Sequence, residues 1–301
     1  MIDVPPALLA FGRWQREGRA GRDWIRALPT TVGGLLTRWG LVPDGEAMNG
    51  YNGMALPVRR DREPLVLKVS WPQEAADCHE ALALAAWDGR GAVRLLAHSP
   101  AEGALLLERA HDRTPLREVV LADAVPAAGV LLRRLAVPAP PGLRHLTDLA
   151  AELAAGLPGR WRELGRPFPR RRLELAHGLA RDLAAPTGGD PLLVDHDLHY
   201  DNVLAADREP WLAVDPKVLA GDPEYQTAQL LWTRLDEMDG PAELLRHFHA
   251  LVDAAGLSPD LARAWTVVRC ADYLLWGLAA GFTEDPRRCA AILDAFAGRR
   301  A

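Results

Sequence analysis

The sequence predicts an α+β protein with two unequal parts, a small strand-rich N-terminal part and a larger, mostly helical C-terminal part. Three observations support this fold class. Alternating apolar patterns lie mostly before residue 110, helical periodicity dominates after residue 116, and the polar stretch between them is typical of a connection. We therefore expect one domain over residues 1–110, a second over residues 116–301, and a hinge at about residues 108–115.

The composition argues against several classes of protein. Hydrophobic residues make up 49% of the chain and charged residues 25%, and no apolar run approaches the roughly 18 residues that cross a membrane. The formal net charge of -5 gives no sign of a nucleic-acid-binding protein. We see no export signal and expect a cytoplasmic protein, with reduced thiols at Cys78, Cys270 and Cys289 and without a zinc site.

Lysine is scarce in this chain. The 35 Lys and Arg residues include two lysines, Lys68 and Lys217. A lysine side chain is a compact charge on a flexible stem, suited to a phosphate oxygen or to a carboxylate within a site. Lys68 lies in an apolar strand pattern and Lys217 follows a candidate metal ligand by two residues, so their positions favour functional roles.

The N-terminal part begins with a helical pattern over residues 7–40, which we expect Pro29 to split and Gly40 to end. A turn-rich segment with Gly50 and Gly53 precedes strand patterns at 54–58 and 65–69. Kinases place a phosphate-covering glycine loop and a nucleotide-binding lysine in this order. Two glycines alone, however, more often mark an ordinary hairpin turn.

A helix over residues 77–87 and strands over residues 92–97 and 104–108 complete the N-terminal part. We expect Lys68 to pair with Glu80, which lies within the helix, and Glu74 is the second choice. The alternative is that both acids are solvated helix charges. Backbone groups of residues 108–110, which include Glu108 and Ala110, could hydrogen-bond an adenine edge.

The segment 192–217 carries the expected chemistry. Asp197 and Asn202 are five residues apart, and Asp215 follows thirteen residues after Asn202. Phosphoryl transfer to a hydroxyl needs an acceptor for the alcohol proton and oxygen ligands for Mg²⁺, and kinases supply Asp, Asn and Asp for these tasks. A lone Asp and Asn at this spacing more often make a polar turn, but the apolar flanks favour a site. We assign Asp197 as catalytic base and Asn202 and Asp215 as metal ligands.

The rest of the C-terminal part is rich in helices and acidic residues. Helical patterns cover residues 117–136, 145–157, 170–185, 224–238, 241–255, 259–282 and 287–298. Residues 221–290 hold eleven acids against six arginines, which suits a cationic acceptor, although a solvated acidic surface explains most of them. Asp272 lies in an apolar helix and needs a partner, either the acceptor or a buried arginine such as Arg269.

The sequence resembles the aminoglycoside phosphotransferases, and within them the streptomycin 6-phosphotransferase and hydroxyurea-resistance branch. The resemblance covers about residues 50–297. It rests on Asp197-Leu-His-Tyr-Asp-Asn202-Val-Leu, Ala213-Val-Asp215-Pro-Lys217 with Gly221-Asp222-Pro-Glu224-Tyr225, the helix that begins at Glu80, Arg269-Cys-Ala-Asp272-Tyr-Leu-Leu-Trp276, and Thr283-Glu-Asp-Pro286.

This resemblance implies a protein-kinase-like bilobal fold, with a small N-terminal β-sheet lobe and a larger helical C-terminal lobe. ATP would lie in the cleft with Mg²⁺, and its γ-phosphate would pass to a hydroxyl of a cationic antibiotic. The expected nucleotide-binding residues are Gly50, Gly53, Lys68, Glu80, Glu108 and Ala110. The expected substrate residues are Asp272, Asp222, Glu224 and Trp276.

A streptomycin-like aminoglycoside is the first expected acceptor. A cyclic peptide antibiotic of the capreomycin or viomycin type, or a small metabolite, is the second. A non-catalytic, pseudokinase-like nucleotide-binding module is the alternative from another class, although such a module has no need of a base together with two metal ligands.

The sequence departs from the family pattern in the catalytic loop. Asp195-His196-Asp197 stands in place of the usual His-Gly-Asp, which leaves open how the loop is braced. We expect His196 to be structural rather than a base, and His199 to order the loop. Gln226 stands where the family often has Asp.

Overall fold

The computed structural model describes residues 4–10, 12–50, 52–72, 79–185 and 188–297. Its contacts divide the chain into two compact units, Met1–Ala110 and His111–Ala301. Glu74 and Cys78, both named in the sequence analysis, lie outside the described residues. None of the helices in the described ranges is both long enough and apolar enough to cross a membrane.

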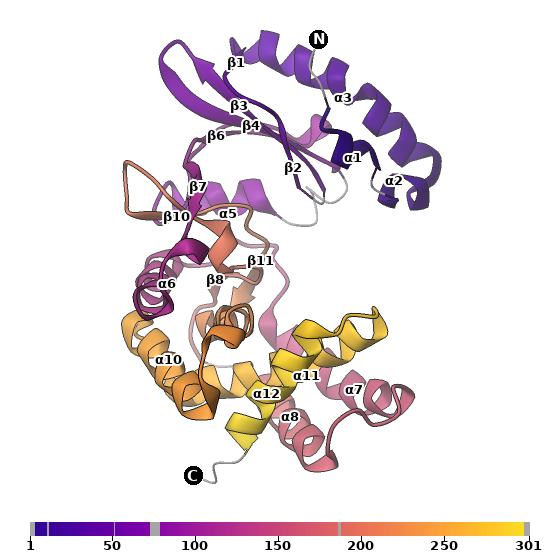
Figure 1. The fold of residues 1–301 in the computed structure, drawn as a ribbon, viewed down its shortest axis with the longest axis vertical. Coiled ribbons are helices and arrows are strands. Elements are labelled where there is room, and N and C mark those ends of the chain that lie inside the picture. Colours follow the sequence, from indigo (N-terminus) through magenta and orange to yellow (C-terminus); the bar gives the residue numbers. More distant parts are fainter. Residues whose placement is uncertain (1–3, 11, 51, 73–78, 186–187, 298–301) are drawn as a thin grey trace. The chain divides into compact units, whose positions relative to one another are not determined.

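The N-terminal unit is an antiparallel sheet with a long helix against it (Figure 1). The strand order is β1-β3-β4-β6-β5, and β2 also pairs with β3. The strands are β1 (Val42–Pro43), β2 (Met48–Asn49), β3 (Gly53–Arg60), β4 (Glu63–Ser70), β5 (Leu95–Ser99) and β6 (Ala104–Glu108). The helices are α1 (Pro6–Ala10), α2 (Arg13–Arg16), α3 (Gly18–Trp39) and α5 (Glu80–Trp87).

Helix α3 runs without a break through Pro29, so the expected split is wrong. Leu28, Val32 and Leu35 recur along one face of the helix and are fully buried in the core that includes the sheet. A proline in a helix interior costs about 3 kcal/mol, whereas burying each of these side chains contributes roughly 1.5–3 kcal/mol. The packed face therefore keeps the helix continuous until Gly40, whose φ of 63° ends it as expected.

The side chains of strand β4 alternate between the two faces of the sheet, one of which packs against this core. Leu65, Leu67 and Val69 are buried in the same core as α3. Side chains alternate along a strand, so Lys68 points to the opposite face. The strand thereby supports one face of the unit with apolar side chains and presents a charge on the other.

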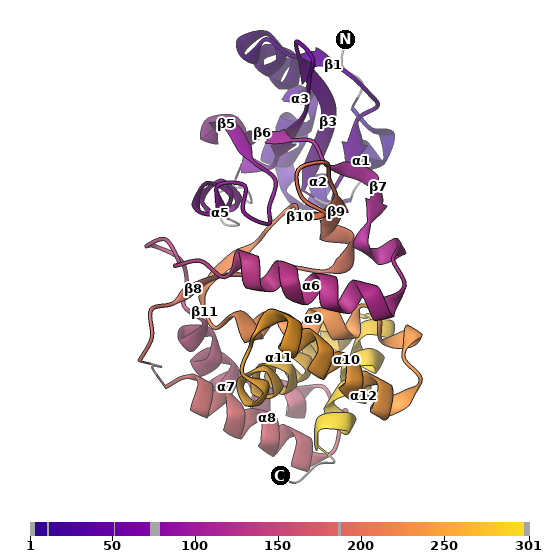
Figure 2. The ribbon, with the colours of Figure 1, turned by 90° about the vertical axis from the view of Figure 1, so that its left-hand side faces the viewer.

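The C-terminal unit is mainly helical (Figure 2). Helix α11 packs against α8, α9 and α12, and α6 packs against α10. Gly129 lets α6 and α10 pack closely against each other, because a Cβ at this position would lie 2.8 Å from the Leu251 carbonyl oxygen of α10. The helices are α6 (Leu121–Leu135), α7 (Leu146–Glu163), α8 (Arg170–Leu183), α9 (Thr227–Trp232), α10 (Gly240–Ala255), α11 (Pro259–Ala279) and α12 (Glu284–Ala297).

Two small sheets carry the segment that was expected to hold the chemistry. One has the order β10-β9-β7, with β7 (His111–Pro115), β9 (Val203–Ala205) and β10 (Trp211–Ala213). The other pairs β8 (Leu192–Asp195) with β11 (Val218–Gly221). Residues 111–115, expected as a connection, therefore form a strand that pairs with β9.

Candidate active site

Backbone pairing holds the two halves of the segment 192–217 next to each other. Asp195 is opposite Val218 in the β8–β11 pair, and the His196 N–H donates to the Lys217 carbonyl at 2.8 Å just beyond it. The Val214 N–H donates to the Asn202 carbonyl at 2.9 Å. Residues far apart in sequence are thus fixed next to one another by backbone hydrogen bonds.

Both carboxylate oxygens of Asp197 accept a side-chain hydrogen bond. Lys217 Nζ donates to Oδ2 at 2.8 Å, and Gln229 Nε2 donates to Oδ1 at 2.9 Å. Burial alone would raise the pKa of Asp197, but the hydrogen bond and charge of Lys217, aided by Gln229, outweigh it and lower the pKa. Asp197 is therefore held as an anion in a fixed orientation, which is the state that a proton acceptor requires.

The two expected metal ligands both follow this carboxylate in the sequence and are positioned by the same segment. Asn202 Nδ2 donates to the Asp197 carbonyl at 3.3 Å, so its Oδ1 is the end that can ligate a cation. Asp215 is exposed and has a φ of 53°, a left-handed conformation that is rare for a residue with a side chain. Such backbone strain is concentrated at functional sites.

Asp195 braces the catalytic loop. Its side chain is 1% exposed, and Oδ1 accepts the backbone N–H groups of Asp197 and Lys217, each at 3.1 Å. Burial raises the pKa of Asp195 to about 8, and the nearby carboxylates of Asp197 and Asp215 add to this effect. At neutral pH the side chain is consequently protonated, and its Oδ1 holds the backbones of Asp197 and Lys217 to one point.

The two histidines of the loop differ in their surroundings. Burial lowers the pKa of His196 to about 4, so its imidazole is neutral at pH 7, and its backbone carbonyl accepts a hydrogen bond from Arg269 at 2.8 Å. His199 Nδ1 lies 3.4 Å from Asp201 Oδ2 within the loop. These contacts agree with structural roles for both residues.

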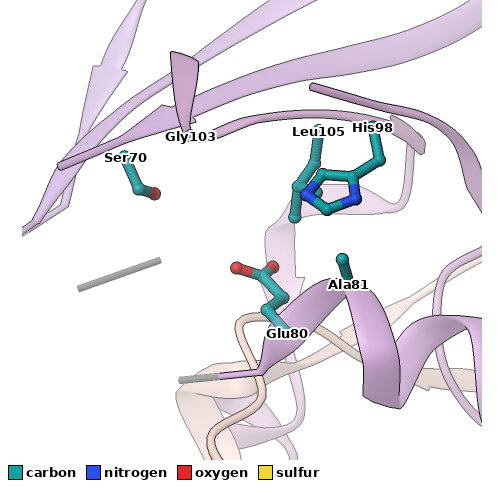
Figure 3. A pocket seen from close by; sticks show the side chains of 6 residues that line it. All are labelled: Ser70, Glu80, Ala81, His98, Gly103 and Leu105. Atoms are coloured by element: carbon teal, nitrogen blue, oxygen red, sulfur yellow. The ribbon is translucent and has the colours of Figure 1, made fainter. Parts of the chain in front are cut away.

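The N-terminal unit contains the expected lysine–glutamate pair. Lys68 Nζ of β4 donates to Glu80 Oε2 of α5 at 2.6 Å, and Glu80 is 7% exposed. The Glu80 side chain borders a cavity of about 20 Å³, room for a single water molecule (Figure 3). Its lining residues are Ser70, Glu80, Ala81, His98, Gly103 and Leu105.

The two glycines of the expected phosphate loop serve different structural needs. The Gly50 N–H donates to the Gly53 carbonyl at 2.9 Å and closes a hairpin between β2 and β3. A Cβ on Gly53 would lie 2.1 Å from the Val69 carbonyl oxygen, whereas a Cβ on Gly50 would meet nothing within 4 Å. Gly53 is therefore required by close packing against β4.

Residues 108–110 are fastened within the N-terminal unit. The Glu108 N–H donates to the Arg94 carbonyl at 2.9 Å, and Glu108 Oε2 accepts the Arg94 N–H at 3.0 Å. Arg109 pairs with Asp44 at 2.6 Å, and Ala110 is 8% exposed. Their role toward an adenine edge stays a prediction.

The expected substrate residues fall into two groups. Asp222 Oδ2 accepts Trp265 Nε1 at 3.0 Å, and the buried Glu224 accepts the Ser258 N–H at 3.0 Å, so both carboxylates have partners inside the unit. Trp276, in contrast, is 48% exposed on α11. It is the one of these residues that offers a large free surface.

Asp272 lies on the same helix as Trp276 and pairs with an arginine that the sequence did not indicate. Arg160 of α7 donates to Asp272 Oδ1 at 2.6 Å, and both side chains are about a third exposed. Arg269, the partner suggested from the sequence, instead contacts the catalytic loop and α9. Arginines likewise neutralise Asp236 and Asp285.

Sequence reasoning missed the contact of Gln229 with Asp197, and Arg269, which it named as a possible partner of Asp272, has other partners. Arg269 is 7% exposed and donates to the carbonyls of His196 and Tyr225 and to Gln229 Oε1. One signal was available: a charged residue within the apolar run from Val267 to Ala271 needs buried hydrogen-bond acceptors. The sequence contains no comparable signal for Gln229.

The model of the aminoglycoside/hydroxyurea antibiotic resistance kinase family matches residues 38–281. The chain belongs to this family. Among characterised relatives, the hydroxyurea phosphotransferase of Kitasatospora aureofaciens is 41% identical over 99% of this chain and 87% of its own length. The streptomycin 6-kinase of Streptomyces glaucescens is 38% identical over 93% of this chain and 92% of its own length.

Solved structures show the fold of this resistance-kinase family in more distant proteins. A crystal structure of aminoglycoside phosphotransferase APH(4)-Ia superposes with a TM-score of 0.59 at 17% identity, covering 91% of this chain and 99% of the other. A choline kinase from Streptococcus pneumoniae superposes with a TM-score of 0.62 at 12% identity, covering 90% and 99%. The protein-kinase-like fold is thereby confirmed, and the fold alone does not distinguish one acceptor from another.

Proposed function

We propose that this antibiotic resistance kinase transfers the γ-phosphate of ATP to a hydroxyl of a streptomycin-like aminoglycoside and so inactivates it. The observation that carries the proposal is the carboxylate of Asp197, which is held as an anion on the same short loop as Asn202. A proton acceptor and an oxygen ligand for a cation, fixed by one loop, are the parts that phosphoryl transfer to an alcohol needs.

In the proposed reaction the acceptor hydroxyl oxygen bonds to the γ-phosphorus while the bond from that phosphorus to the β–γ bridging oxygen breaks. Asp197 orients the hydroxyl and takes its proton, and ADP leaves with the electron pair of the broken bond. Lys68, fixed by Glu80, would neutralise charge on the nucleotide phosphates.

Magnesium fits the donors that the segment provides. Asn202 offers an amide oxygen and Asp215 a carboxylate, and Mg²⁺ in kinases is held by one or two such side chains together with phosphate oxygens. Mg²⁺ bound there would neutralise charge that develops on the transferred phosphoryl group. The exposed position and strained φ of Asp215 support this assignment.

For the acceptor we propose the surface of α11 around Trp276 and Asp272. Trp276 lies 5.1 Å from the Tyr273 ring and 5.4 Å from the Phe282 ring. Burial, together with the charge of Asp285, raises the pKa of Tyr273 to about 12, so its phenol stays protonated at neutral pH. Aromatic faces stack on sugar rings and on guanidinium groups. Asp272, whose charge Arg160 partly neutralises, is about a third exposed on the same helix.

Hydroxyurea is a second candidate acceptor, because the relative from Kitasatospora aureofaciens is named a hydroxyurea phosphotransferase and is 41% identical to this chain. The purified protein, γ-labelled ATP and Mg²⁺ should be incubated separately with streptomycin, hydroxyurea, capreomycin and viomycin. We expect label in streptomycin and none with Asp197→Ala. Transfer to hydroxyurea or a cyclic peptide alone would replace the proposed acceptor, and no Asp197-dependent transfer to any of them would contradict the kinase assignment for this panel.

A further inference from the structure

The amide of Gln229 is in contact with the catalytic carboxylate at one end and with a buried arginine at the other. Nε2 donates to Asp197 Oδ1 at 2.9 Å, and Oε1 accepts from the Arg269 guanidinium at 2.9 Å. Arginine has donors and no acceptor, so Gln229 must direct its oxygen to Arg269 and its N–H group to Asp197. The orientation of the amide is therefore fixed by chemistry.

Arg269 is itself held on several sides. Its guanidinium carbon lies 4.2 Å from the Tyr225 ring centroid and 5.0 Å from that of Trp232. It donates to the Tyr225 carbonyl at 3.2 Å and to the His196 carbonyl at 2.8 Å. A charge that is 7% exposed is tolerated when it has hydrogen-bond acceptors, and two acceptors of Arg269 adjoin Asp197: the His196 carbonyl and Gln229 Oε1.

The side chain of Gln229 is also shielded from solvent, since the residue is 8% exposed on α9. A flexible carboxylate on a loop would sample several rotamers, whereas a donor anchored in a packed helix restricts it to one. The other carboxylate oxygen is bound by Lys217, which comes from the segment after β10. Two separate segments therefore determine where the base points.

We propose that Gln229 and Arg269 are positioning residues of the kinase: Arg269 orients Gln229, and Gln229 holds the Asp197 carboxylate in line with the acceptor hydroxyl. This inference rests on the proposed role of Asp197 as the base. It assigns a function in turnover to two buried residues of α9 and α11 that have no expected contact with ATP or Mg²⁺.

The decisive variant is Gln229→Glu. A glutamate keeps the acceptor for Arg269 but removes the donor to Asp197 and places a second negative charge beside it. Gln229→Leu removes both interactions. We expect each variant to lower kcat about tenfold to 100-fold, the scale of a misplaced catalytic group, while the KM and Kd for Mg-ATP stay within twofold of wild type.

Gln226→Leu is the matched control, because Gln226 is another buried glutamine of the same segment, and its amide donates to the Pro223 carbonyl instead. The melting temperature of each variant separates loss of fold from loss of position. If Gln229→Leu has a lower melting temperature than the wild type, the kcat of Gln229→Glu tests the inference, because this variant retains the contact with Arg269. A kcat within twofold of wild type for Gln229→Glu would overturn the inference, as would a loss equal to that of Gln226→Leu.

Arg269 is tested by a double-mutant cycle with Arg269→Lys and Gln229→Leu, with Arg263→Met as control on the same helix. If Arg269 acts through Gln229, Arg269→Lys lowers kcat in the wild type and has little further effect in Gln229→Leu. Fully additive losses would overturn this part of the inference.

Rates should be measured both with streptomycin and as Mg-ATP hydrolysis, in which water is the acceptor, so that the result does not depend on the identity of the antibiotic. Asp197→Ala in the same assays distinguishes the two proposals. Full activity in Asp197→Ala would refute the role of the base, whereas its loss together with full activity in Gln229→Glu would refute only the positioning role.

Discussion

Lys217 Nζ lies 2.8 Å from Asp197 Oδ2, so the second of the two lysines in this chain pairs with the carboxylate that we propose as the base. The first, Lys68, pairs with Glu80 at 2.6 Å. The scarcity of lysine in the sequence thus corresponds to two specific ion pairs, one in each unit. Lys217 is positioned to orient the Asp197 carboxylate and to neutralise its charge rather than to serve as a surface charge.

Lys217→Met should lower kcat about tenfold to 100-fold, because Asp197 loses the charge that orients and stabilises its anion. Lys217→Arg should give an intermediate rate, since it restores the charge with a different shape. Steady-state kinetics with streptomycin check both variants. Arg19→Met, at an exposed position of α3, is the control. A Lys217→Met enzyme as fast as wild type would exclude this role.

Alanine substitutions of Asp197 and Asp215 should impair different steps, transfer in the first case and ATP binding in the second. Asp197→Ala should retain Mg²⁺-dependent ATP binding and lose transfer, because the carboxylate acts on the acceptor hydroxyl. Asp215→Ala should lose the Mg²⁺-dependent part of ATP binding, because it removes a metal ligand. Titration calorimetry with ATP, with and without Mg²⁺, measures the difference. An equal loss of binding in both variants would mean that the roles are misassigned.

Asp195 should make the stability of the fold depend on pH. Its pKa is raised by burial from 3.8 to about 8 in the folded chain, so the folded state retains a proton that the unfolded state has released. Its contribution to the free energy of unfolding is therefore largest below pH 4, falls between about pH 4 and 8, and levels off above pH 8.

Asp195→Asn keeps a neutral side chain at every pH and removes this dependence. Between pH 6 and pH 9 the melting temperature of the wild type should fall more than that of Asp195→Asn. Asp190→Asn, at an exposed position, is the control. Parallel melting curves of wild type and Asp195→Asn across this range would show that Asp195 is ionised in the fold.

The two glycines of the β2–β3 hairpin should respond unequally to alanine. Gly53→Ala places a Cβ 2.1 Å from the Val69 carbonyl oxygen, so either the turn or β4 must shift. We expect a loss of a few kcal/mol in stability, on the scale of overpacking, and a raised KM for ATP. Gly50→Ala meets no atom within 4 Å and is the matched control. Equal losses in Gly53→Ala and Gly50→Ala would show that the close packing of Gly53 against β4 is not what the hairpin requires.

Trp276→Ala should raise the KM for streptomycin and leave the KM for ATP unchanged. An exposed aromatic contact contributes about 1 kcal/mol, which corresponds to a change of roughly fivefold. Val130→Ala removes another exposed apolar side chain, on α6, and serves as control. If both KM values rise together in Trp276→Ala, the surface is not specific to the acceptor.

The sequence was sufficient to predict elements whose apolar pattern repeats over a few neighbouring residues. Alternation along residues 54–58 and 65–69 predicted the strands that present Lys68, and the position of Glu80 in the following helix predicted the pair. The fold class followed from these patterns and from the family resemblance. The assignment of roles to Asp197, Asn202 and Asp215 stays a prediction that the geometry supports.

The sequence was insufficient where tertiary contacts override local preference. Pro29 and Pro158 lie inside continuous helices because buried faces on either side hold them in place. Asp272 and Arg160 are 112 residues apart, and Gln229 is 32 residues from Asp197. No periodicity or spacing connects such residues, so their contacts emerge only once the helices are packed.

The pairing of both lysines with carboxylates has a chemical consequence for the protein. Primary amines other than the chain terminus occur only at these two ion pairs. A reagent that acylates amines, or a lysine acetyltransferase, can therefore modify no side-chain amine outside them. Because acetylation removes the positive charge of lysine, any lysine modification of this kind would break an ion pair, either with Glu80 or with Asp197.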